Sequence, residues 1–301
     1  MRSVLALLVS VLLAFGTAIP TTAGGGAGGV LSTGTAKNAA AASSTTSADP
    51  DSAAVVSAVG QAVQNAADVG VTEQVVVLDR STGALITSTG SADAVPAMSL
   101  VKLFLALDVI NVAGGVGNVD ASTLAELKAM ITTSDDVIAS DLYAAYGGSA
   151  SIDRVIADYG LTGSSPSPEE EYWGDVQITA SDVASLLYQA LSAADTGSWL
   201  ATAMAAATDT AADGFDQDFG VNALDGAGSK QGWGCCLGGV VALHSVGFTA
   251  TSIVVVLSTS YPDQDSSDLQ SAAQLAADPG AQTAISQVTA TARAAALGTV
   301  G

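Results

Sequence analysis

One lysine lies inside an apolar run in the stretch PAMSLVKLFLALDVI, residues 96–110. Lys102 follows Leu100 and Val101 and precedes the apolar segment 103–107. Such a run predicts a buried helix, where an ammonium group is costly unless it is paired or loses its proton. Ser99 lies three residues before the lysine, so a helix would place both side chains on one face. The fold must therefore supply a polar environment beside a buried helix.

The pair has the composition of a nucleophile and its base. A serine hydroxyl is a poor nucleophile until a base takes its proton, and a lysine in apolar surroundings can lose its charge and serve as that base. Ser99 falls at the predicted start of the helix, where free N–H groups could polarise an acyl oxygen. The alternative is a lysine that extends to solvent from a helix packed elsewhere.

Helix and strand patterns follow one another in blocks. The segment 51–68 has apolar residues at helical spacing, and 73–90 predicts a hairpin around DRSTG. Helices are predicted across the region 99–207, at 99–113, 122–131, 134–146, 151–160, 179–191 and 198–207. Strands are predicted at 228–236, 237–248 and 249–259, and closing helices at 266–277 and 281–296. The order is helix, two strands, helical block, three strands and helices.

Two further polar clusters accompany Ser99 and Lys102. ITTSDD places Ser134 near a helix start, and GSKQGW places Lys230 near a strand start. With the motifs S-x-x-K, S-D-D and K-Q-G in this order, the chain resembles the class A β-lactamases and D,D-peptidases. The resemblance implies an α+β fold, with a five-stranded antiparallel sheet flanked by N- and C-terminal helices and an all-α subdomain.

The resemblance also implies roles for the matching residues. Ser99 would attack a β-lactam or D-Ala–D-Ala carbonyl, and Lys102 would accept its proton. Ser134 would pass a proton to the leaving nitrogen, and Lys230 would attract the substrate carboxylate. Gly232 belongs to the third motif, and the backbone N–H groups of Ser99 and Trp233 would form the oxyanion hole. No cofactor or metal is implied.

Two positions depart from the family pattern. Asp136 replaces the asparagine of S-D-N, and an ionised carboxylate cannot donate to a substrate amide. It would also hold Lys102 protonated, which weakens the lysine as a base. Gln231 replaces a hydroxyl that the family uses near the substrate carboxylate. Its amide can still donate, so we expect reduced affinity rather than none.

The deacylating glutamate is the third point of divergence. Class A β-lactamases carry it on the omega loop, and spacing forward from Ser134 points to Glu170. Spacing backward from ITASDVA points into the Ser-Pro segment instead, so the loop is shortened. The alternative is that residues 169–171 form a solvated acidic run. Without this glutamate the acyl-enzyme would turn over slowly.

The adjacent Cys235 and Cys236 admit several states. They could form a disulfide with each other, remain buried thiols, or bridge to another molecule. His244 is the only histidine, and in the middle of a predicted strand we expect it to be a packing residue. The aspartates of DTAADGFDQDFG do not have the spacing of an EF-hand calcium loop.

The N-terminal region indicates export. Residues 1–23 have a charged start, a short apolar run and small residues before Ala23, as in a signal peptide. Both cysteines lie far from this region, which argues against a lipid anchor. Residues 24–50 resemble a disordered linker. We expect one domain at 51–301, with an α/β part (51–98 and 226–301) and a helical subdomain (99–225).

The charge balance limits the partners. Acids outnumber bases 29 to 8, which disfavours nucleic acid and anionic membranes. We expect a secreted or extracytoplasmic monomer that acts on a small molecule or cell-wall peptide without inserting stably into a membrane. The rival interpretations are a catalytically impaired binding module of the cell envelope, and an esterase that uses the same Ser99 and Lys102.

Overall fold

The computed structural model describes residues 50–236, 239–262, 269 and 271–297. The predicted signal peptide at 1–23, and the predicted linker at 24–50 apart from its last residue, lie outside the described residues. Within the described part, no helix combines the length and apolarity needed to cross a membrane.

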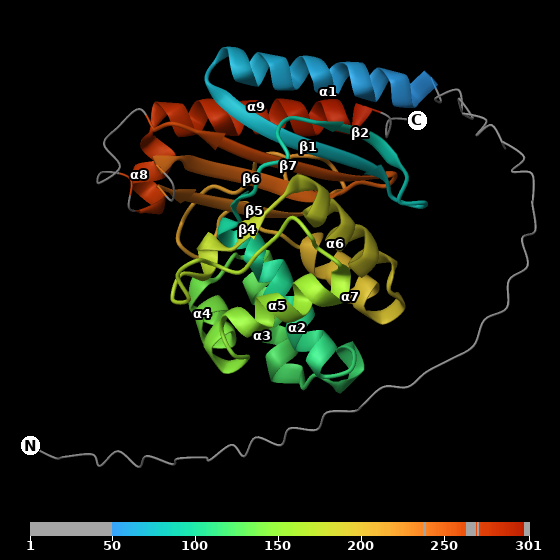
Figure 1. Ribbon diagram of the computed structural model, residues 1–301, viewed down its shortest axis with the longest axis vertical. Helices are drawn as coiled ribbons and strands as arrows, with labels where there is room; N and C mark the ends of the chain where they lie inside the picture. The colour runs from blue at the N-terminus through green and yellow to red at the C-terminus, as the bar shows by residue number, and fades with distance from the viewer. Residues whose placement is uncertain (1–49, 237–238, 263–268, 270, 298–301) are drawn as a thin grey trace, which may run out of the picture. The chain divides into compact units, whose positions relative to one another are not determined.

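A five-stranded antiparallel sheet forms the centre of the α/β part (Figure 1). The strands are β1 (Val71–Asp79), β2 (Leu85–Thr89), β5 (Gly228–Cys235), β6 (Val241–Phe248) and β7 (Ser252–Ser260). Their order in the sheet is β2-β1-β7-β6-β5, so β5 is an edge strand. Its outer edge is therefore free to meet a substrate or another element.

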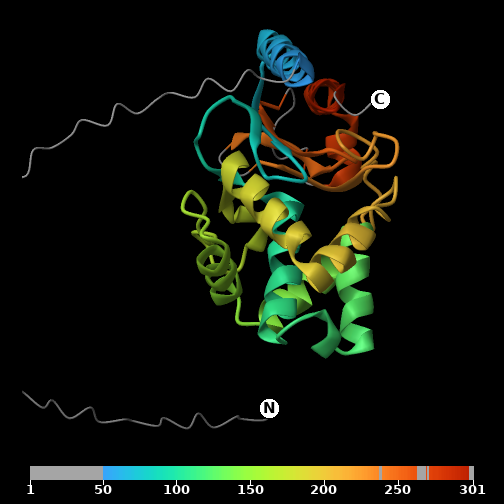
Figure 2. The same ribbon diagram turned by 90° about the vertical axis from the view of Figure 1, so that its right-hand side faces the viewer.

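Two long helices cover one face of the sheet. The helices α1 (Pro50–Asp68) and α9 (Pro279–Ala295) lie side by side there, as both views show (Figures 1 and 2). The short helix α8 (Ala272–Ala277) precedes α9. Val59 of α1, Val288 of α9 and Val254 of β7 belong to the apolar core between these layers.

The remaining helices form a second layer against the opposite face. They are α2 (Val101–Val112), α3 (Ala121–Thr132), α4 (Asp136–Ala145), α5 (Ser149–Tyr159), α6 (Ala180–Ser192) and α7 (Ala194–Met204). Short 3-10 turns lie at η1 (Met98–Leu100), η2 (Val116–Asn118) and η3 (Trp173–Asp175). Helix α2 is buried from Val101 to Ile110, as its all-round apolar sequence predicts.

The predicted fold class is confirmed, with shifts at several element ends. Helix α4 begins at Asp136 rather than Ser134, because the Asp135 side chain accepts from the N–H groups of Val137 and Ile138 as its N-cap. Helix α7 begins at Ala194, four residues before the predicted 198. Of the predicted helix 266–277, the described part is α8, and 266–268 and 270 lie outside the described residues.

A small second sheet was not predicted. Strands β3 (Val95–Pro96) and β4 (Gln177–Ile178) pair antiparallel. This pairing connects the chain just before Ser99 to the segment that leads into α6. Two-residue strands carry too little periodic pattern to be recognised in a sequence.

Candidate active site

Ser99 is held in η1, directly before α2, and is almost completely buried. The preceding residues are fixed from two sides: Ala97 N donates to Val176 O at 2.7 Å, and His244 Nε2 lies 2.8 Å from Pro96 O. Met98 has φ of 49°, a conformation that L-residues other than glycine seldom adopt. Such backbone strain persists where surrounding structure holds it, often at functional sites.

A continuous chain of polar groups begins at Ser99. Lys102 Nζ lies 2.6 Å from Ser99 Oγ and 3.3 Å from Ser134 Oγ. Lys230 Nζ donates to the same Ser134 Oγ at 2.7 Å and to Gln231 O at 2.7 Å. The structure thus brings together three segments that are far apart in the sequence, from α2, the α3–α4 junction and β5.

Lys102 also forms an ion pair. Its Nζ lies 2.5 Å from Asp136 Oδ1, and the lysine side chain is fully buried while the aspartate side chain is 59 % exposed. Burial lowers the pKa of Lys102 below its usual value, and Asp136 opposes this effect by favouring the charged form. The ion pair is the arrangement that the S-D-D sequence predicts.

Lys230 is buried as completely as Lys102. Its pKa lies well below its usual value, because burial and the nearby positive charge of Lys102 both disfavour a second ammonium group. Ser134, between the two amines, has φ of 55°. The neighbouring Thr133 O accepts from Ala212 N at 2.7 Å, which fixes this junction against the loop before β5.

The outer edge of β5 lies against η1. A Cβ at Gly232 would come within 2.9 Å of Ala97 O, so this close approach requires glycine. Trp233 and Ser99 both line one cavity. Gln231 points elsewhere: its side chain is fully buried, and its Nε2 lies 3.4 Å from Ser245 Oγ on β6. The sequence pattern placed Gln231 near the substrate, but among the described residues it does not line the cavity.

The cavity over Ser99 has a volume of about 380 Å³. Among the described residues, its charged lining consists of four carboxylates: Asp136, Glu171, Asp175 and Asp213. Its aromatic lining comprises Tyr172, Trp173 and Trp233. Apolar atoms of Met98, Leu269, Ala272 and Leu275 complete much of the wall. This volume suits a small molecule or a short peptide segment.

Glu170, the sequence candidate for the deacylating base, is not part of this lining. Its carboxylate lies beside Gly148, and its backbone O accepts from Tyr143 at 3.0 Å. An indole ring, and not the Glu170 carboxylate, lies next to the lysine: Lys102 Nζ is 4.9 Å from the Trp173 ring centroid. Sequence reasoning missed Trp173, Asp175 and Asp213, because loop paths rather than any motif bring them to the cavity.

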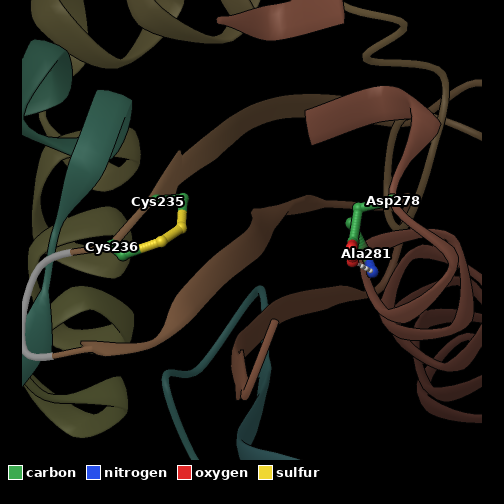
Figure 3. The surroundings of a disulfide bond; sticks show 4 residues. All are labelled: Cys235, Cys236, Asp278 and Ala281. Atoms are coloured by element: carbon green, nitrogen blue, oxygen red, sulfur yellow. Dashed lines mark hydrogen bonds between the residues drawn. A yellow bond between two sulfur atoms is a disulfide. The ribbon is translucent and has the colours of Figure 1, made fainter. Parts of the chain in front are cut away.

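Cys235 and Cys236 form a disulfide with each other (Figure 3). Of the three states that the sequence left open, the structure therefore contains the bridge between neighbouring cysteines. Both cysteines are partly exposed, and Cys235 lines the cavity. Figure 3 also shows the N-cap of α9, where Ala281 N donates to Asp278 Oδ1 at 2.8 Å.

His244 is a buried packing residue, as expected. Its Nδ1 accepts from Ser258 N at 3.1 Å, so Nε2 carries the proton and donates to Pro96 O. Burial lowers its pKa to about 4, so the ring is neutral near pH 7. Within the described ranges, no group of three or more His, Cys, Asp or Glu residues is arranged to hold a metal ion.

Comparison with solved structures identifies the fold. A β-lactamase from Chitinophaga pinensis superimposes with a TM-score of 0.59 at 14 % identity, over 80 % of this chain and 97 % of that one. A class A β-lactamase from Mycobacterium abscessus gives 0.57 at 17 % identity, over 79 % and 98 %. The chain is therefore β-lactamase-like in fold and divergent in sequence.

Sequence comparison gives a different relative. A Mycobacterium tuberculosis protein named "Putative lipoprotein LppW" is 33 % identical over 192 residues, and a Mycobacterium bovis protein of the same name matches equally. The match spans 60 % of this chain and 60 % of the relative. No family model matches the chain.

Proposed function

We propose that this chain is a serine acyl-transfer enzyme that acts on β-lactams or D-Ala–D-Ala-type peptides through an acyl-serine intermediate. The observation that carries the proposal is the polar chain from Ser99 through Lys102 and Ser134 to Lys230, with steps of 2.6, 3.3 and 2.7 Å. These distances permit proton transfer between neighbouring groups. The cavity beside Ser99 gives a substrate carbonyl access to the hydroxyl.

The groups of the polar chain act in sequence in the proposed reaction. Ser99 Oγ attacks the carbonyl carbon as its proton passes to Lys102 Nζ, and the backbone N–H groups of Ser99 and Trp233 stabilise the oxyanion. As the C–N bond breaks, Ser134 gives a proton to the leaving nitrogen. The Lys102 ammonium, 3.3 Å from Ser134 Oγ, then passes the proton that it took from Ser99 to Ser134, which restores the Ser134 hydroxyl and the neutral amine. Lys230 holds Ser134 in place at 2.7 Å.

Hydrolysis of the acyl-serine is proposed to be slow. The second step needs a water activated next to Ser99 and Lys102. Trp173 contacts the lysine there, and the carboxylate of Glu170 lies beside Gly148 instead. An indole N–H only donates hydrogen bonds, so Trp173 cannot act as the base for water. The proposed activity is therefore closer to a penicillin-binding protein than to an efficient β-lactamase.

The test is covalent labelling of the full chain with a fluorescent penicillin, followed by intact-mass analysis. We expect one adduct per chain that persists for minutes or longer and is lost in Ser99→Ala. The control Ser198→Ala, in an exposed turn of α7, keeps the adduct. If folded protein carries no adduct at high penicillin excess, the proposed acylation of Ser99 by β-lactams is wrong.

The Lys102–Asp136 ion pair favours one alternative. If it holds the lysine permanently charged, the cavity could bind a cell-envelope peptide or partner without turnover. In that case a ligand protects the fold against thermal unfolding equally in the parent chain and in Ser99→Ala. No covalent adduct would form in either protein.

The proposed setting is outside the cytoplasm, with the chain acting as a monomer. The signal-like residues 1–23 and a relative whose name includes "lipoprotein" support this setting. The proposed reaction uses side chains and backbone N–H groups, and requires no cofactor or nucleic-acid partner.

A further inference from the structure

The charged side chains that line the cavity all have the same sign. Among the described residues, carboxylates are the only charged side chains that line it. Asp213 lies beside Trp233, whose Nε1 donates to Asp213 Oδ2 at 3.1 Å, and Glu171 is exposed in the loop before η3. A ligand in this space therefore meets negative charge on the β5 side and on the η3 side.

The nearby cations balance only part of this charge: Lys102 pairs with Asp136, whereas no ion pair among the described residues involves Glu171, Asp175 or Asp213. Lys102 and Lys230 are buried behind Ser99 and Ser134, and neither belongs to the lining. Lys102 is paired with Asp136, and Lys230 donates to Ser134 and to a backbone carbonyl. The arginines that the structure describes lie elsewhere: Arg80 donates to Thr249 O, Arg154 pairs with Asp108, and Arg293 is in α9.

The walls strengthen the field of these carboxylates. Trp233 stacks on Phe215 with ring centroids 4.8 Å apart, and Trp173 and several aliphatic side chains add further low-dielectric surface. A cleft with apolar walls and charge of one sign concentrates counter-ions. Burial and nearby Glu169 raise the pKa of Asp175, which indicates a carboxylate that lacks full compensation. Tyr172, 57 % exposed, offers a ring to a cation.

We infer that the acyl part of the substrate carries a positive charge, as in an acyl donor that ends in an ammonium or guanidinium group. This inference rests on the proposed acylation of Ser99 and names the class of acyl group transferred. The net charge of −21 acts in the same direction at long range, because it attracts cations and repels anions before binding. An acyl chain that ends in a carboxylate is the disfavoured case.

The test uses p-nitrophenyl esters of three straight-chain acids of equal length, which end in an ammonium group, a methyl group or a carboxylate. Release of p-nitrophenol gives the second-order acylation rate constant, and intact mass confirms the adduct on Ser99. We expect the ammonium ester to react about tenfold faster than the methyl ester, and the carboxylate ester to react slowest. The advantage should shrink as NaCl rises from about 20 to about 200 mM.

Two double variants test whether the preference for the ammonium ester comes from the carboxylates of the cavity. The double variant Glu171→Gln/Asp213→Asn should bring the ammonium-to-methyl rate ratio close to one. The control Asp195→Asn/Asp225→Asn removes the same charge outside the cavity and should keep the ratio near that of the parent chain. Circular dichroism and thermal unfolding confirm that each variant is folded.

The outcomes separate the inference from the proposed function. Equal rates for the three esters, or a faster carboxylate ester, overturn the inference while the adduct on Ser99 still supports the proposed acyl transfer. Loss of the preference in both double variants also overturns it, because the effect would then come from overall charge. If none of the esters labels Ser99 in folded protein, the proposed function fails together with the inference.

Discussion

Asp136 is the residue that most affects the proposed chemistry. Its carboxylate lies 2.5 Å from Lys102 Nζ and raises the pKa of that amine against the effect of burial. A lysine must be neutral to act as a general base and accept the proton of Ser99. The identity of this one side chain therefore affects how much of the lysine is ready to react near pH 7.

The substitution Asp136→Asn should increase acylation. Removing the carboxylate lowers the pKa of Lys102, so the acid limb of the pH–rate profile moves to lower pH. We expect the acylation rate constant near pH 7 to rise by about tenfold. This is less than the roughly 10²- to 10⁴-fold that a general base contributes in full, because part of Lys102 already reacts in the parent chain. The measurement is penicillin or ester acylation across roughly pH 5 to 9.

The matched control is Asp135→Asn. It removes a charge one residue away and keeps the N-cap, since asparagine caps helices as well as aspartate does. Asp135 raises the pKa of Lys102 less than Asp136 does, so the pH–rate profile of this variant should shift much less than that of Asp136→Asn. An Asp136→Asn protein with an unchanged profile would show that the ion pair does not control the proton on Lys102.

The residues of the polar chain were predictable because motif spacing fixed them. Ser99 and Lys102 share a helix face, and the apolar residues on both sides of Lys102 mark that lysine as unusual. Trp173 and Asp213 were not predictable, because their positions depend on loops with no periodic pattern. The direction of Gln231 was missed for another reason: strand alternation separates it from Lys230, so the two side chains point to opposite faces.

At the scale of elements, β1 and α9 meet through a buried acid. Thr291 Oγ1 of α9 donates to Glu73 Oε2 at 2.6 Å, and Glu73 is only 2 % exposed. Its other oxygen, Oε1, has no hydrogen-bond partner. Burial raises the pKa of Glu73 to about 7, although the bond from Thr291 partly offsets the effect.

The substitution Glu73→Gln should stabilise the protein above neutral pH. In the unfolded chain the carboxyl ionises near pH 4.5, whereas in the folded protein it stays protonated until about pH 7. Its contribution to stability is therefore complete below pH 4.5 and is lost as pH rises through 7. The cost above pH 7 is about 3 kcal/mol. Denaturant unfolding at about pH 8 should show that Glu73→Gln raises the free energy of unfolding by most of this cost.

The control for this contact is Glu126→Gln, an exposed position in α3. It should follow the parent chain across the whole pH range. If Glu73→Gln lowers the free energy of unfolding equally at pH 5 and pH 8, the carboxyl acts by packing alone.

Element prediction succeeded where periodicity was strong and failed where it was local. The apolar spacing of 51–68 and the largely apolar sequence of α2 predict helices directly. The start of α4 moved because two aspartates and a serine all have the chemistry of an N-cap, and only the folded backbone selects Asp135. The β3–β4 pair depends on tertiary contacts between residues about 80 apart.

At the scale of the whole molecule, charge opposes compactness. The chain carries a net charge of −21, and the described residues contain two ion pairs, Lys102–Asp136 and Arg154–Asp108. Most carboxylates of the described residues therefore lack a cationic partner in an ion pair. Folding brings like charges closer together than they are in the unfolded chain, so the repulsion lowers the free energy of unfolding.

Added salt should therefore stabilise the fold at neutral pH. The screening length falls to about 10 Å at 0.1 M salt, which weakens repulsion across the molecule more than it weakens the short ion pairs. Between about 20 and 300 mM NaCl we expect a gain of about 1 kcal/mol, or roughly 2–4 °C in Tm, by calorimetry at pH 7. Near pH 4.1, the isoelectric point expected from the sequence, the same salt step should give little gain because the net charge is then close to zero. Equal stabilisation at both pH values would mean that salt acts through the solvent, and that repulsion between carboxylates does not limit the stability of this fold.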